Sequence, residues 1–196
     1  MTFWNWRNAS ATGMAGATAA ATVLTANDLA PIELYTADAR IVGWIRANGQ
    51  RVTDLLNGND ELHLWHPSPG PITEPVDHNS GEPITVPDDP GEWQSVMTEQ
   101  LVLAMPPEWR AARQLRLHRK LRRVALTAGP FSVTGNLHLA PGVEATDYSV
   151  IRNRRFLPLT DAYLLHNGEP PFEHVVSVVI VNTAQITQLV PLVTLA

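Results

Sequence analysis

The stretches IELYTADARIVGWI (residues 32–45) and VALTAGPFSVTGNL (residues 124–137) carry one pattern twice in the same chain. In both, alternate positions are apolar, and a glycine, Gly43 or Gly135, falls in the second arm. An alternation with a period of two is typical of a strand that buries one face. A glycine inside such a strand indicates a sharp bend or a close backbone approach. Each stretch is therefore predicted to form two strands, the second of them bent.

The likeness between the two parts of the chain continues downstream in the same order. The matched segments are GQRVTDLL (49–56) with GVEATDYS (142–149), ELHLWHP (61–67) with FLPLTDA (156–162), and SVMTEQLVLAMP (95–106) with IVNTAQITQLVP (180–191). The spacing between the copies changes only at loops. Matches that keep their order in this way indicate an internal duplication, and the alternative is a chance likeness between two β-rich stretches.

The repeat sets the domain organisation that we expect. Four to five short, bent strands in each copy describe a small β-barrel. The chain is predicted to be mainly β, with an N-terminal arm (1–30), a first barrel (31–106), a linker helix (107–123) and a second barrel (124–196). The 16 prolines and 12 glycines agree with short strands and turns rather than a helical bundle.

The linker PPEWRAARQLRLHRKLRRVAL is the most basic part of the chain. Residues 108–123 contain no glycine or proline and are rich in helix formers, which predicts a helix of about four turns. Its candidate binding residues are Arg110, Arg113, Arg116, Arg119, Lys120 and Arg123. Four roles stay open for this helix: a connector that pairs with acidic loops, a surface for an acidic protein, a nucleic-acid surface, or a membrane surface.

The bent glycine strand, the Asp-containing turn and the closing VVIVNTAQITQLVP resemble the Sm/LSm-like small barrels, which are SH3-like. This resemblance covers about residues 32–106 and 124–192. It implies barrels that assemble edge to edge and often bind RNA. It also places candidate binding residues in the loops, namely Asp54, Asn57, Gln100, Asp147 and Gln185. In the family, an asparagine follows the aspartate of this loop. Asn57 follows Asp54 in the first copy, but no asparagine follows Asp147 in the second. The closing turns lack the family's basic residue and glycine.

Composition limits the classes of function. A net charge of −5 argues against a dedicated nucleic-acid binder. With no cysteine, the chain has no disulfide, no thiolate metal site and no cysteine nucleophile, and this composition fits the cytoplasm. No apolar run reaches the roughly 18–20 residues of a membrane span.

No catalytic motif stands out in the sequence. His63 and His66 suggest a metal pair, but residues three apart on a strand face opposite sides, and the repeat sets Pro158 opposite His63. Leu62 and Leu64 are predicted to point inward, which leaves the histidines and Trp65 on the outer face and rim. We therefore predict no metal, no cofactor and no enzymatic activity.

Three tryptophans, Trp4, Trp6 and Trp65, are candidates for docking on a partner. The sequence as a whole predicts a non-catalytic binding or assembly module in a larger complex, with a protein partner or self-association through strand edges. The alternatives are RNA binding through the basic helix and the barrel loops, and a metal-dependent enzyme that uses His63 and His66.

Overall fold

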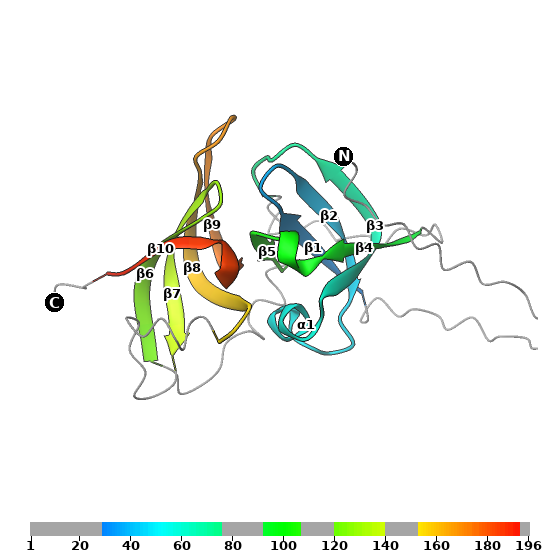
Figure 1. Cartoon of the computed structure of the whole chain (residues 1–196), viewed down its shortest axis with the longest axis horizontal. Helices are drawn as coiled ribbons and strands as arrows, with labels where there is room; N and C mark the ends of the chain where they lie inside the picture. Colours follow the sequence, from blue (N-terminus) through cyan, green and yellow to red (C-terminus); the bar gives the residue numbers. More distant parts are fainter. Residues whose placement is uncertain (1–28, 76–91, 107–119, 140–152, 193–196) are drawn as a thin grey trace, which may run out of the picture.

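The computed structural model describes residues 29–75, 92–106, 120–139 and 153–192. Most of these residues lie in strands of one open antiparallel sheet, in the order β10-β6-β7-β8-β9-β5-β1-β2-β3-β4. Figure 1 shows that the sheet is strongly bent into two parts that lie side by side. We call β1–β5 the first half and β6–β10 the second half. The prediction of a mainly β chain is confirmed.

The first half contains five strands and one α-helix. Its elements are β1 (Leu29–Tyr35), β2 (Arg40–Arg46), α1 (Val52–Gly58), β3 (Glu61–Gly70), β4 (Trp93–Met97), the 3-10 helix η1 (Thr98–Gln100) and β5 (Leu103–Met105). The second half contains β6 (Lys120–Ala128), β7 (Phe131–Leu139), β8 (Phe156–His166), β9 (Phe172–Asn182), the 3-10 helix η3 (Thr183–Gln185) and β10 (Ile186–Pro191). Within the described residues, no helix is long and apolar enough to cross a membrane.

The strands of the two halves pair in the same register. Ile32 pairs with Gly43 in the first half, as Val124 pairs with Gly135 in the second. The next pairing in each half shifts by one residue at that glycine, between Val42 and Trp44 and between Thr134 and Asn136. In both halves the extra residue lies in the partner strand, β3 or β8, opposite the glycine, and a β-bulge bends the strand that carries it.

The two halves also match beyond the glycines. His66 and Asp161, which the sequence comparison sets opposite each other, both have a positive φ, of 49° and 47°. Non-glycine residues seldom adopt this region. Leu62 pairs with Val96 as Leu157 pairs with Val181. The two predicted closing turns are the 3-10 helices η1 and η3.

Helix α1 was not expected, because a turn was predicted after β2. Val52 and Leu56, four residues apart, lie on one side of this helix and are both almost fully buried. Asp54 is exposed in the first turn of α1, whose N-cap is Arg51.

The structure corrects the predictions for the linker helix and for the two barrels. Residues 107–119 lie outside the described residues, but the last four residues of the predicted helix, 120–123, begin strand β6. Two small barrels in tandem were also predicted, whereas the strands of both halves join in one open sheet through the pairing of β5 with β9. An edge strand that finds a partner in the neighbouring half need not close on its own half.

Each half surrounds its own apolar core, and each core takes side chains from the other half. Phe156, Val178 and Ile180 of the second half pack into the first core. Tyr35 and Val102 of the first half pack into the second, where the ring of Tyr35 meets that of Phe131 edge-on. This exchange ties the halves into one structure, in addition to the strand pairing.

Candidate functional site

The junction between the halves is a short antiparallel pairing of β5 with β9. Leu103 lies opposite Val181, and Ala104 lies opposite Ile180. The Asn182 backbone N–H donates to the carbonyl of Val102 at 3.0 Å. The Asn182 side chain donates to the carbonyl of Leu101 at 2.8 Å. β5 is thus a strand of the first half that is added to the edge of the second half.

At this junction β5 fills a slot in the second half, which we call the β9 slot. We define it by Ala128, Gly129, Pro130, Phe131, Val133, Ile180, Val181 and Gln185, the sequence counterparts of the residues that line the β4 slot described below. Val102 and Leu103 lie in one buried cluster with four of these residues. A Cβ built on Gly129 would lie 3.2 Å from a methyl group of Val102. The slot therefore holds Val102 with almost no spare room.

The corresponding place in the first half is a cavity of about 400 Å³, which we call the β4 slot. It is lined by Thr36, Ala37, Asp38, Ala39, Ile41, Ser95, Val96 and Gln100. β4 is the last strand of the sheet on this side, so within the described residues no strand lies beside it. Of these residues, only Gln100 was a candidate from the sequence, because the slot exists only where the turn between β1 and β2 folds back beside β4.

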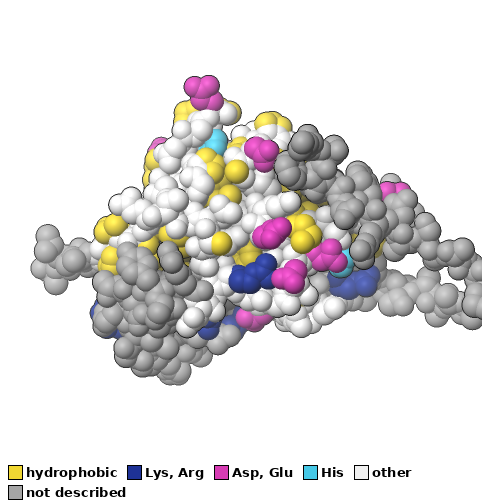
Figure 2. All heavy atoms as spheres, in the orientation of Figure 1, with side chains coloured by type: hydrophobic (Ala, Val, Ile, Leu, Met, Phe, Trp, Pro, Cys, Tyr) yellow, Lys and Arg dark blue, Asp and Glu magenta, His cyan; other side chains and the backbone are white. Residues whose placement is uncertain are grey.

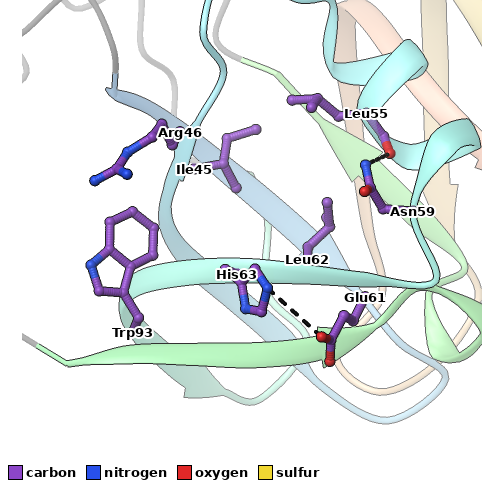
Figure 3. Close-up of a pocket in the computed structure, with 8 residues that line it drawn as sticks. All are labelled: Ile45, Arg46, Leu55, Asn59, Glu61, Leu62, His63 and Trp93. Carbon is purple, nitrogen blue, oxygen red and sulfur yellow. Dashed lines mark hydrogen bonds and ion pairs between the residues drawn. The ribbon is translucent and has the colours of Figure 1, made fainter. Parts of the chain in front are cut away.

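A second hollow, of about 450 Å³, lies between α1 and strands β2, β3 and β4. Figure 3 shows Leu62 and Ile45 between two walls, with Arg46 and Trp93 on one side and Leu55 and Asn59 on the other. The Arg46 guanidinium lies 5.1 Å from the Trp93 ring centroid, a cation–π arrangement. The apolar floor and the mixed charges of the rim suit an amphipathic group.

The rim of this hollow also carries His63, which is exposed and whose ring contacts two neighbours. Its Nε2 lies 3.7 Å from Glu61, and its Nδ1 lies 2.9 Å from the hydroxyl oxygen of Ser95. Leu62 and Leu64 are buried as predicted, so His63 points away from the core. Trp65, predicted on the outer face, is instead buried at 6% exposure. The positive φ at His66 interrupts the alternation, so two consecutive residues face inward.

A buried polar cluster lies on β1 and β2. Arg40 forms an ion pair with the almost fully buried Glu33, with a nitrogen–oxygen distance of 2.9 Å. The single proton of the Tyr35 hydroxyl has two acceptors within hydrogen-bond distance, Glu33 at 3.2 Å and the Thr73 carbonyl at 3.1 Å. Burial, reinforced by the Glu33 carboxylate, raises the pKa of Tyr35 well above its usual value. These residues are occupied with one another, so the cluster has a structural role.

One of the predicted loop residues, Asn57, joins the two halves. The Asn57 side chain pairs with both backbone groups of Phe156, donating at 3.1 Å and accepting at 3.0 Å. Asp54 is exposed on α1. Gln185 is half-buried in η3, at the position in the second half that Gln100 has in the first. The structure therefore does not bring Asp54, Asn57 and Gln100 together as one pocket, and Asp147 lies outside the described residues.

The basic candidates are divided between the linker and strand β6. Arg110, Arg113, Arg116 and Arg119, like Trp4 and Trp6, lie outside the described residues, so their predicted roles stay predictions. Lys120 and Arg123 lie on β6, where Arg123 donates to the carbonyl of Asp161 at 2.9 Å. On the face shown in Figure 2, charged side chains of both signs gather near the middle, and no large basic patch is seen. In the part of the chain that the structure describes, no three metal-ligating side chains come together.

No known family model, curated protein or solved structure matches this chain. The case for a function therefore depends on the two open hollows and on the strand pairing between the halves.

Proposed function

We propose that this chain is a non-catalytic binding and assembly module, which recruits protein strands to the open ends of its sheet. The observation that carries this proposal is the pairing of β5 with β9. It shows that the fold accepts an added strand at this position. β4 and β10 are the repeat counterparts of these two strands and end the sheet. Strand addition at an open edge is a common mode of protein recognition.

We further propose that the chain arose by duplication of one small barrel of the Sm-like type, opened so that its halves share a sheet. The equal registers, the paired bulges at Gly43 and Gly135 and the two 3-10 helices support the duplication. The cysteine-free composition supports a cytoplasmic location.

The physical reason for the proposal is that edge strands are costly to leave open. An edge offers backbone N–H and C=O groups to any neighbouring strand, and natural proteins cover or blunt such edges. β4 carries Met97, which is 36% exposed, and β10 carries Val190, which is 42% exposed. An apolar side chain on an open edge strand marks a surface that is ready to pair.

The test is a mass measurement in solution, combined with recovery of partners from the native host. A self-assembled species, or a protein partner that is lost with Ser95→Arg on β4, supports the proposal. The matched control is Val175→Arg on β9, because Val175 is 71% exposed and lies away from both end strands. A monomer at all concentrations that recovers no partner contradicts the proposal.

A further inference from the structure

We infer that the β4 slot takes the β10 strand of a second copy of this chain, so that copies associate head to tail. This inference rests on the proposed function and names its partner. It assigns Thr187 and Gln188 of one copy to the place beside β4 of the next copy. In the second half, Val102 and Leu103 hold the equivalent place.

The register of the contact follows from the internal repeat. Within the chain, Leu103 pairs with Val181, Ala104 pairs with Ile180, and Asn182 donates to Val102. The sequence comparison sets Thr187, Gln188 and Leu189 opposite Val102, Leu103 and Ala104, and it sets Ser95, Val96 and Met97 opposite Ile180, Val181 and Asn182. Gln188 of one copy should therefore lie opposite Val96 of the next, and Leu189 opposite Ser95.

The polarity of the slot and the polarity of the strand change together between the internal junction and the open ends of the sheet. Inside the chain an apolar strand, with Val102 and Leu103, lies in one buried cluster with Ala128, the counterpart of Thr36. The counterparts of Asp38 and Ser95 there are the apolar residues Pro130 and Ile180. At the open ends the counterpart strand carries Thr187 and Gln188. The counterpart slot carries Thr36, Asp38 and Ser95. Polar groups thus face polar groups in the proposed contact, as apolar groups face apolar groups in the internal one.

This matched change favours a second copy over an unrelated strand. Threonine has nearly the size and shape of valine, so Thr187 suits a slot whose counterpart holds Val102. An apolar strand would remove water from the polar lining of the β4 slot without offering it new hydrogen bonds, at a cost in free energy. The difference in polarity also keeps the two junctions from exchanging partners, because the wrong pairing buries polar groups against apolar ones.

The charges around the two ends are also complementary. Glu99 lies in η1, and Glu61 lies in β3, the strand that pairs with β4. Lys120, Arg122 and Arg123 lie on β6, which pairs with β10. An acidic end that meets a basic end attracts the copies and orients them.

The contact joins two different surfaces, so each copy that docks leaves one free slot and one free strand. Such heterologous contacts build rings when the rotation closes, and filaments when it does not. The assembly should therefore contain more than two copies at high protein concentration. It should also weaken with added salt, which screens the attraction between the charged ends.

Cysteine cross-linking tests the register, because the chain has no cysteine of its own. Ala37 is the counterpart of Gly129, and both Ala37 and Thr187 are exposed. In the internal junction, the Cβ built on Gly129 lies 3.9 Å from that of Val102. This distance suits a disulfide. We would mix an isotope-labelled Ala37→Cys variant with an unlabelled Thr187→Cys variant, oxidise them gently, and identify the mixed dimer by mass. The control is Ala37→Cys mixed with Val175→Cys.

We expect the mixed dimer in the test pair, well above its yield in the control pair. A charge pair at Gln188 gives a second readout. Gln188→Glu should weaken association and Gln188→Lys should strengthen it, each about two- to fivefold, because the β4 end is acidic. If the unmodified chain assembles but the cross-link does not exceed the control, the head-to-tail contact is wrong and the proposed function stands. If the chain stays monomeric without partners, both are wrong.

Discussion

The side-chain amide of Asn57 on α1 pairs with both backbone groups of Phe156, at the start of β8. An amide can do this because it presents one donor and one acceptor side by side, as a neighbouring strand does. Asn57 also donates to the carbonyl of Thr53 at 2.8 Å, which holds its side chain in place. A residue predicted as part of a ligand loop therefore anchors one half of the protein to the other.

Replacement of Asn57 should loosen this anchor. In Asn57→Ala the buried backbone groups of Phe156 lose their partner, and we expect the free energy of unfolding to fall by about 1–3 kcal/mol. Urea unfolding followed by tryptophan fluorescence measures this change. Asn59→Ala is the matched control, because the exposed Asn59 side chain donates to the Leu55 carbonyl, within the same half, and its loss should change the stability by no more than about 0.5 kcal/mol. Equal effects would contradict the anchoring role.

The two repeat-related glycines should differ in their tolerance of a methyl group. A Cβ on Gly135 would lie 3.0 Å from the Cβ of Leu159, whereas a Cβ on Gly43 has no neighbour closer than 3.4 Å. We expect Gly135→Ala to lower the free energy of unfolding by about 1–3 kcal/mol, since the neighbours must move. Gly43→Ala should be nearly neutral. Thermal unfolding of both variants tests this difference. A melting temperature that is lower for Gly43→Ala than for Gly135→Ala would refute it.

The ion pair of Glu33 and Arg40 should be costly to break. Arg40→Met leaves the buried Glu33 carboxylate without its cation, and we expect a loss of about 3–5 kcal/mol. Denaturant unfolding at neutral pH gives the measurement. For comparison, Glu61→Gln removes an exposed pair with His63 and should cost no more than about 1 kcal/mol. A small effect of Arg40→Met would mean that water reaches this site.

Tyr35 should make the protein less stable in alkaline solution. Burial raises the pKa of Tyr35 in the folded chain, whereas the unfolded chain ionises near the ordinary value of 10.0. The folded state then keeps a proton that the unfolded state loses, so this contribution to stability is complete below pH 10 and declines as the pH rises above it. Between pH 9 and pH 11 the wild type should lose about 1.4 kcal/mol more than Tyr35→Phe. Denaturant unfolding of both proteins at pH 9 and pH 11 tests this. An equal loss of stability in the wild type and in Tyr35→Phe would contradict the prediction.

Leu103 and its repeat counterpart Gln188 should differ sharply in stability. Leu103 is fully buried at the internal junction, so Leu103→Ala should cost about 2–5 kcal/mol. Gln188 is exposed on β10, so Gln188→Ala should change the stability of a dilute monomer by less than about 0.5 kcal/mol. Chemical unfolding at low protein concentration separates this effect from assembly. A large loss for Gln188→Ala would show that β10 is already covered in the monomer.

The sequence was a good guide to local structure in this protein. The alternation predicted the paired strands β1 with β2 and β6 with β7, and Leu62 and Leu64 were predicted correctly as inward residues. Helix α1 was missed because its seven residues are too few to show a clear helical period. Trp65 was misplaced because the reversal at His66 depends on a backbone angle that the sequence pattern does not reveal.

The candidate site was much harder to predict, because its residues come together only in the folded chain. Thr36 and Asp38 lie in the turn after β1, far along the chain from Ser95, and neither carries a recognisable motif. Leu103 and Val181 meet across the sheet although 78 positions separate them in the sequence. Long-range pairing of this kind is not encoded in any local pattern.

The sequence by itself determined the repeated strand grammar, since the periodicity of side chains and the places of glycine act within a few residues. The tertiary structure alone decided that the halves open and share one sheet, because this depends on pairing between strands that lie far apart in the sequence. β5 found its partner in β9, and β4 and β10 end the sheet. The pairing that joins the halves thus leaves β4 and β10 as the open strands on which the proposed assembly depends.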